Sequence, residues 1–173
     1  NPMVPIWLIL DDGTPYDEVR VLELAVFVVR KGRIRESLNH QRFLRRNRLK
    51  KRGLDGFWLF ASERFFVIES FLAAFELRNI FHLENDVMLY ARLDDLLPVC
   101  AEQSPELGMT MDSEQRCIPG IVFIRDRESL QRLNAHIVSN SLKRKHTDME
   151  ALASFMVAVT GKHCSPLPVV PTA

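Results

Sequence analysis

The sequence predicts an α/β fold in which a mostly parallel sheet is flanked by helices. Short apolar runs rich in branched residues alternate along the chain with longer segments whose apolar residues recur at helical spacing. Hydrophobic residues make up 47% and charged residues 26% of 173 residues, which suffices for one domain with its own core and not for two. We therefore expect a single domain over residues 1–173, with a ligand crevice beyond the carboxyl ends of its strands.

The first third of the chain predicts two strands and a helix. Pro5–Leu10 is a short apolar run closed by the turn residues Asp11-Asp12-Gly13, which is typical of a buried strand. Val19–Val29 is rich in branched residues and predicts a second strand, with helix as the alternative over its first half. Ile34–Arg52 is polar and basic with few apolar positions, which favours a helix with one thin apolar face.

The middle of the chain carries the strongest helical periodicity. Phenylalanines recur at helical spacing after Ser62, which we expect to be the N-cap of a helix that ends near residues 77–79 and packs on the sheet. Ile80–Leu83 then predicts a strand, and residues 93–97 a helical turn stopped by Pro98. The remaining expected elements are strands at 107–111 and 121–124, helices at 127–138 and 147–159, and a Pro-rich tail at 164–173.

Charge and cysteine content limit the partners of the chain. Lys and Arg number 23 against 22 for Asp and Glu, and a net charge of +1 excludes binding to nucleic acid or membrane through bulk charge. The three cysteines fit no zinc or redox spacing, so we expect free thiols in a reducing compartment. No apolar run reaches the length of a membrane helix, and the first residues lack the basic and apolar regions of a signal peptide. P-loop, dinucleotide-binding and serine-hydrolase motifs are absent from these 173 residues. These features predict a cytoplasmic location and no transmembrane segment.

One acidic motif, Glu84-Asn85-Asp86, follows the predicted strand Ile80–Leu83. Two carboxylates one residue apart at the end of a buried strand need a cation to offset their desolvation. Their oxygens suit Mn²⁺ or Mg²⁺, which often shares its coordination shell with nucleotide phosphates and neutralises a leaving diphosphate. Acid-x-acid triplets are also common in solvated turns, so a turn without a ligand is the alternative interpretation.

The segment Ser62–Tyr90, which contains this motif, resembles the glycosyltransferases of the GT-A fold. In that family a helix carrying an arginine precedes a strand that ends in an Asp-x-Asp-type motif. The resemblance continues through Pro119–Ile124 and Thr147–Leu152, and Pro5–Asp12 looks like the first nucleotide-binding strand. It implies a GT-A-like, Rossmann-like fold that lacks its C-terminal part, and a metal-dependent transfer of sugar from a UDP- or GDP-sugar donor to an unknown acceptor hydroxyl.

The resemblance also implies which residues hold the metal and the diphosphate. Glu84 and Asp86 would bind Mn²⁺ or Mg²⁺, with Glu84 standing where the family usually has Asp, and Asn85 would lie at the donor. Arg64 matches the helix arginine that reaches the donor sugar or diphosphate, because a planar, permanently charged fork suits phosphate. An exposed ion pair with a neighbouring glutamate is the alternative for Arg64.

Three further acids resemble residues that contact the donor. Asp148 matches an acid that touches the donor sugar and is our candidate catalytic residue, with an acid favoured by a helix N-terminus as the alternative. Asp11 and Asp12 are expected to face the base or ribose of the donor, although Asp-Asp-Gly is also an ordinary turn.

A second hypothesis for function rests on the basic segment 42–52, which holds seven cations. Such a patch can bind RNA, anionic lipid or a phosphorylated acceptor. The alternative function is therefore a non-catalytic or truncated GT-A-like scaffold that binds a polyanion there. A solvated helix face is the favoured interpretation of this segment, so no nucleic-acid partner is expected. His82, inside the predicted strand, is expected to be a hydrogen-bonded core histidine.

Overall fold

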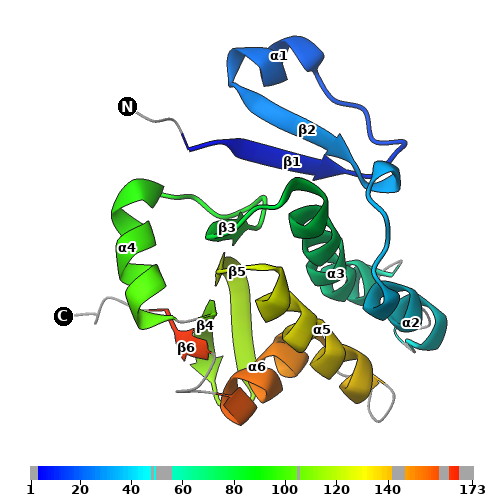
Figure 1. The fold of residues 1–173 in the computed structure, drawn as a ribbon, viewed down its shortest axis with the longest axis vertical. Helices are drawn as coiled ribbons and strands as arrows, with labels where there is room; N and C mark the ends of the chain where they lie inside the picture. Colours follow the sequence, from blue (N-terminus) through cyan, green and yellow to red (C-terminus); the bar gives the residue numbers. More distant parts are fainter. Residues whose placement is uncertain are drawn as a thin grey trace. The chain divides into compact units, whose positions relative to one another are not determined.

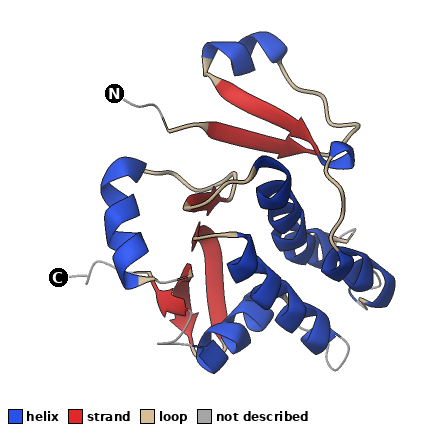
Figure 2. Ribbon diagram, in the orientation of Figure 1, coloured by secondary structure: helices blue, strands red, loops and turns tan. Residues whose placement is uncertain are grey.

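The computed structural model describes residues 4–47, 49, 56–104, 106–141, 147–159 and 164–167. The chain forms two compact units, Asn1–Arg35 and Glu36–Ala173, and each is described by itself below. Both units combine helices with strands, so the predicted α/β class is confirmed (Figures 1 and 2). A single domain over residues 1–173 stays a prediction.

The first unit is a strand–helix–strand motif. Strands β1 (Ile6–Leu10) and β2 (Val26–Arg30) are parallel, with Ile6 opposite Val26 and Leu10 opposite Arg30. Helix α1 (Glu18–Glu23) connects them, and a short 3-10 helix (Lys31–Arg33) follows β2. Both predicted strands are confirmed, and so is the helical alternative for the first half of residues 19–29. Parallel strands require such a crossover between them.

The second unit is built on a four-stranded mixed sheet. Its strands are β3 (Ile80–Leu83), β4 (Leu107–Ser113), β5 (Arg116–Ile124) and β6 (Cys164–Pro166), in the order β3-β5-β4-β6. β5 is antiparallel to both β3 and β4, and only β4 and β6 are parallel. The prediction of a mostly parallel sheet is therefore wrong for this unit. Ser113 pairs with Arg116 across a two-residue turn, and strands joined so closely must be antiparallel.

Helices cover both faces of this sheet. Helices α3 (Phe57–Phe75), α5 (Arg127–Ser141) and α6 (Asp148–Val159) lie on one side, with α2 (Leu38–Arg46) beside α3 and α5 (Figure 1). Helix α4 (Leu93–Gln103) lies on the other side, where Cys100 packs with Phe123 and Leu167. The largest fully buried side chains include three phenylalanines of α2 and α3, Phe43, Phe65 and Phe66. The expected aromatic core of the long helix, Phe65, Phe66, Phe71 and Phe75, is confirmed for the first three, whereas Phe75 is exposed at the end of the helix.

Three helices run further than predicted: α3, α4 and α5, the last of which ends at Ser141 rather than at residue 138. Helix α3 begins at Phe57 rather than after Ser62, because Gly56 adopts the left-handed conformation (φ 87°) and starts the helix one turn and a half earlier. Helix α4 continues through Pro98 instead of stopping before it. The carbonyl that Pro98 leaves without a partner belongs to Asp94, and both residues are exposed, so water can solvate it.

Proline also sits inside strand structure, where the sequence predicted a boundary. β5 begins at Arg116 and contains Pro119. The register of β5 against β4 shifts there, so the missing N–H of proline falls in an irregularity of the ladder. The predicted tail 164–173 starts as strand β6 at the sheet edge, and Leu167 is buried; residues 168–173 lie outside the described part.

The structure bears on three further predictions, which concern the cysteines, the membrane-spanning segments and the basic helix. All three cysteines, Cys100, Cys117 and Cys164, are free and buried. Among the described residues, no helix combines the length and apolar character that crossing a membrane requires. The predicted basic helix 34–52 is confirmed over Leu38–Arg46, whereas residues 48 and 50–52 lie outside the described residues.

Candidate functional site

Arg64 joins two acids that are far apart in the sequence. Its Nη2 donates to Oδ2 of Asp148 over 2.9 Å, and its Nη1 donates to Oε1 of Glu84. Arg64 projects from α3, Glu84 follows β3, and Asp148 is the first residue of α6. Three candidate residues that the sequence singled out separately therefore meet in one cluster. We call Arg64, Glu84 and Asp148 the arginine–acid cluster.

Strand geometry explains why Glu84 faces α3. Side chains alternate along a strand, so Glu84 and His82 lie on the same face of the sheet. The Glu84 N–H donates to the Gly120 carbonyl over 3.0 Å, which continues the ladder one residue beyond β3. The chain then turns, because the Val87 N–H donates back to the Glu84 carbonyl over 3.1 Å. The Glu84 side chain is held at the end of the strand, where it reaches Arg64.

A capping box positions Asp148. Thr147 Oγ1 accepts from the Glu150 N–H over 3.3 Å, and the Glu150 side chain accepts from the Thr147 N–H over 2.7 Å. This reciprocal pair fixes the start of α6 and directs Asp148 inward, where only 4% of it is exposed. The pattern Thr-x-x-Glu is visible in the sequence and is a recognised signal for a helix start.

Replacing Thr147 with alanine is expected to lower the free energy of unfolding by about 1 kcal/mol, because α6 loses its N-cap acceptor. Serine at the same position keeps an oxygen and should restore most of the stability. Urea denaturation of Thr147→Ala and Thr147→Ser measures both effects. Equal stability of the alanine variant and the wild type would contradict the capping role.

Burial sets the electrostatics of Asp148. Desolvation raises the pKa of its carboxyl above the ordinary value, against the lowering by the Arg64 guanidinium and by the nearby backbone N–H of Met149. Glu84 adds a smaller raising effect. Oδ1 of Asp148 is buried and makes no well-aligned hydrogen bond with any described group. The ion pair with Arg64 therefore holds a carboxylate in a place that disfavours its charge.

Two further titratable side chains, His82 and Cys117, lie near the arginine–acid cluster. Burial, followed by the charge of Arg64, lowers the pKa of His82 to about 4. Burial raises the pKa of the Cys117 thiol to about 12, with a further raise from Asp148 and a lowering by Arg64. Both groups are therefore neutral at neutral pH. The sequence identified His82 as a core residue with a hydrogen bond, but its Nε2 is buried without one among the described residues.

The acidic motif offers oxygen ligands for a cation. A Cβ at Gly120 would lie 3.1 Å from Cγ2 of Val87 and 4.0 Å from Oε2 of Glu84, so this glycine allows the turn after β3 to pack closely on β5. Asn85 and Asp86 are exposed in the turn that follows, and Asp86 forms no ion pair within the described part of the chain. These carboxylates fit a hard divalent cation that keeps several positions for water and phosphate. In residues 4–167, with the gaps given above, no three His, Cys, Asp or Glu side chains form a metal cluster.

Asp11 and Asp12 belong to the first unit, where they stabilise a turn. The Asp11 carbonyl accepts from Arg30 Nη1 over 2.8 Å and from the Thr14 N–H over 3.0 Å. Oδ1 of Asp12 accepts from the Gly32 N–H over 3.3 Å, and a side chain at Gly32 would clash with this carboxylate. These contacts match the alternative of an ordinary turn, and donor binding by the two acids stays a prediction.

The structure adds residues that sequence reasoning did not assign to the site. Gly120 lies in Pro119–Ile124, a segment that resembles the GT-A glycosyltransferases. The sequence does not place it beside Glu84, because that proximity depends on β3 pairing with β5. Cys117 and His82 likewise approach Arg64 only through the packing of the sheet against α3 and α6. No local pattern in the sequence signals such contacts.

No family model matches the chain, and no curated protein matches it either.

Proposed function

We propose that this protein is a metal-dependent glycosyltransferase of the GT-A type, which transfers a sugar from a nucleotide-diphosphate donor to an acceptor hydroxyl. The observation that carries the proposal is the arginine–acid cluster. Arg64, Glu84 and Asp148 were each selected from a different segment of the sequence, and they meet at the carboxyl end of β3.

The chemistry of the cluster suits a donor that carries both phosphate and sugar hydroxyls. Arg64 presents a planar, permanently charged fork, which can bind two diphosphate oxygens. Asp148 has a buried oxygen that makes no well-aligned hydrogen bond with described groups and can accept from a sugar hydroxyl. The cluster therefore contains a hydrogen-bond donor, Arg64, for the phosphate groups of the nucleotide-sugar and a hydrogen-bond acceptor, Asp148, for its sugar hydroxyls.

The metal of the proposal is Mn²⁺ or Mg²⁺, which Glu84 and Asp86 would hold. When bound, such a cation supplies positive charge that stabilises the leaving nucleoside diphosphate. The fit rests on the chemistry of the two side chains, because both supply carboxylate oxygens, the ligands that these cations prefer. Nη1 of Arg64 contacts the other oxygen of Glu84 and Nη2 contacts Asp148, so a diphosphate would replace one of these acids on the guanidinium.

Thermal denaturation with Mn²⁺ and UDP or GDP tests the proposal. Ligand at 100 times its dissociation constant should stabilise the wild type by about 2.7 kcal/mol, a rise in Tm of roughly 5 to 10 °C. Asp86→Ala should abolish this rise, because it removes an exposed carboxylate of the motif without disturbing the core. Asp95→Ala, which removes an exposed acid from α4, is the matched control and should keep the rise. The absence of any shift with either nucleotide at millimolar Mn²⁺ would refute the proposal.

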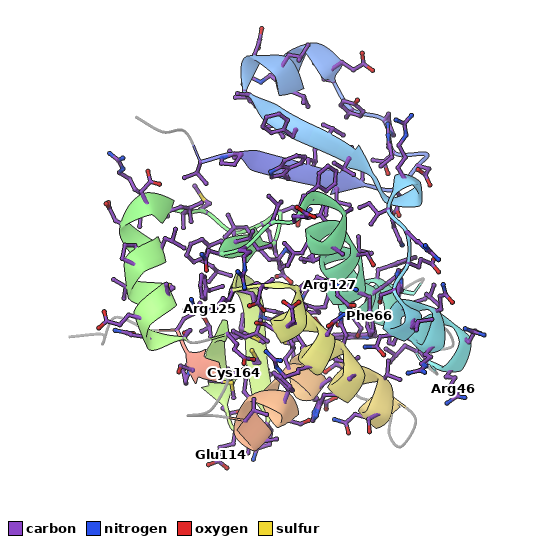
Figure 3. All side chains as sticks on the ribbon, viewed as in Figure 1. Arg46, Phe66, Glu114, Arg125, Arg127 and Cys164 are labelled. Atoms are coloured by element: carbon purple, nitrogen blue, oxygen red, sulfur yellow. The ribbon has the colours of Figure 1, made fainter. Side chains whose placement is uncertain are left out.

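A second candidate function is polyanion binding through the basic segment 42–52. Its described arginines, Arg42, Arg45 and Arg46, are exposed on α2, and none pairs with an acid among the described residues. Figure 3 shows Arg46 at the outer end of this helix. Binding of a polyanion that weakens with salt and is unaffected by Asp86→Ala would favour this candidate over the glycosyltransferase.

A further inference from the structure

Helix α2 is anchored to the protein by its inward side. Phe43 is fully buried, and its ring stacks on that of Phe66 in α3 with 4.6 Å between the centroids. His40 is 2% exposed, and its Nε2 lies 2.9 Å from Oε1 of Glu63, also in α3. The Ser37 hydroxyl caps α2 by accepting from the His40 N–H over 3.2 Å. These contacts fix the orientation of α2, so its opposite side faces solvent in one defined arrangement.

The outward side of α2 carries a stripe of one leucine and three arginines. Leu38, Arg42, Arg45 and Arg46 stand at positions i, i+4, i+7 and i+8, which fall on one face of a helix. All four side chains are exposed, Leu38 to 70%. We call these four residues the α2 stripe. It combines positive charge with an apolar side chain that the protein itself does not cover.

No acid balances the charge of the α2 stripe. The sequence has no Asp or Glu between Ser37 and Asp55, and none of the three arginines pairs with a carboxylate in the described part of the chain. Exposed arginines elsewhere in the second unit do pair with acids: Arg78 with Asp126, Arg92 with Asp94, and Arg116 with Asp112. The α2 stripe is therefore available to neutralise an external anion.

The mixture of charge and apolar area favours a lipid surface over a nucleic acid. Arginine forks bind the phosphate groups of either partner. Proteins that hold single-stranded nucleic acid add aromatic side chains on which bases stack, and the α2 stripe has none. A leucine gains instead by inserting among lipid chains beside anionic headgroups, where basic and apolar side chains act together. The exposed Leu38 is thus the feature that distinguishes the two partners.

We propose that the α2 stripe docks the protein on a membrane surface that carries anionic phospholipids. Arg42, Arg45 and Arg46 would bind the headgroup phosphates, and Leu38 would insert between the headgroups. The helix would lie parallel to the surface, because the stripe runs along its length. The proposal rests on the second candidate function, which it narrows from any polyanion to lipid, and it is independent of the glycosyltransferase.

Sedimentation of the full chain with phospholipid vesicles tests the docking. Binding to phosphatidylcholine vesicles that contain about 30% phosphatidylserine should be roughly tenfold tighter than to phosphatidylcholine alone. It should weaken as salt rises from about 0.1 to about 0.5 M, because salt screens the arginines. Replacing Arg42, Arg45 and Arg46 together with glutamine should weaken binding about 100-fold, since each cation near the surface contributes roughly fivefold. Glutamine is a good helix former, so α2 should remain folded.

The matched control is a triple variant with the same change in net charge. Arg78→Gln, Arg92→Gln and Arg116→Gln together remove three exposed arginines that pair with acids, and vesicle binding should stay within roughly threefold of the wild type. Leu38→Gln should weaken binding about tenfold at both salt concentrations, because an apolar contribution is not screened. All variants should keep the thermal stability of the wild type, because they leave the contacts of His40 and Phe43 intact.

The outcomes separate lipid docking from both candidate functions. Vesicle binding that is equal for the two lipid compositions, or that survives the triple variant of α2, overturns the proposal. Binding of heparin or single-stranded RNA without vesicle binding, or vesicle binding that is indifferent to Leu38→Gln, overturns the choice of lipid and supports polyanion binding at α2. Binding to none of these partners overturns both. The thermal shift with Mn²⁺ and UDP or GDP should be unchanged in the triple variant of α2, so a failure of the glycosyltransferase proposal appears in that shift and not in vesicle binding.

Discussion

Replacing Arg64 with methionine is expected to lower the free energy of unfolding by about 3 kcal/mol at neutral pH, which is the usual cost of removing one partner from a buried ion pair. The Asp148 side chain is only 5% exposed, so its carboxylate would be left buried without a counter-charge. The Tm should fall by roughly 6 to 12 °C. Under the proposed function, nucleotide binding in the presence of Mn²⁺ should be lost as well, because the diphosphate would lose the guanidinium that binds it.

The pH dependence of this deficit follows from Asp148. Its pKa is already raised by burial, and Arg64 is a group that lowers it, so the Arg64→Met variant should raise it further. A raised carboxyl pKa means that the native state binds the proton more readily than the unfolded state. The loss of stability caused by Arg64→Met is therefore largest above the raised pKa of Asp148. It becomes smaller as the pH falls through that pKa toward 3.8, the ordinary value of an aspartate.

Denaturant unfolding at several pH values measures both effects. Arg64→Lys is the matched control, since lysine keeps the charge but cannot bridge two carboxylates with a planar fork. Its free energy of unfolding should lie between those of the wild type and Arg64→Met. Adding Asp148→Asn to Arg64→Met should recover part of the stability, because the buried charge is removed. A deficit below about 1 kcal/mol that is independent of pH would show that the pair carries little energy.

Replacing Asn134 with leucine should have an effect of similar size, about 3 kcal/mol. Asn134 is fully buried on α5, and its Nδ2 donates to Oε2 of Glu69 over 2.7 Å and to the Phe65 carbonyl over 3.1 Å. Glu69 is 1% exposed, so the variant leaves a buried carboxylate without this donor. These bonds tie α5 to the segment of α3 that carries Arg64, so they also steady the candidate site.

A double variant separates the polar contact from packing. Glu69→Met combined with Asn134→Leu replaces both partners with apolar groups and should be more stable than Asn134→Leu alone. Asn140→Leu, on the same helix but only half-buried and bonded to Ser154, is the control and should cost about 1 kcal/mol. Thermal and urea unfolding provide the comparison. A double variant less stable than the single variant would contradict the buried-carboxylate explanation.

Local sequence patterns predicted an element correctly where a single signal, an apolar run or a helix start, decided its structure. Ile80–Leu83 is the strand that its apolar run predicted, and Asp148–Val159 begins one residue after the predicted start. Prediction was wrong where a local signal permitted more than one structure. Pro98 stays inside α4 because its turn faces solvent, and the sheet of the second unit is mixed because a two-residue turn joins β4 to β5. The start of α3 depends on the left-handed conformation of Gly56, which the composition permits but does not require.

The sequence by itself determined the order of the elements and placed acids directly after β3, because apolar periodicity and turn residues act over a few neighbouring positions. It also singled out Arg64, Glu84 and Asp148 as candidates through resemblance to a family. Only the tertiary structure decided that these residues touch, since Arg64 lies 20 residues from Glu84 and 84 from Asp148. Their meeting depends on how α3 and α6 pack against a sheet whose strand order is nonlocal. The same packing buries Nε of Arg64 and Nε2 of His82, and neither atom makes a hydrogen bond among the described residues.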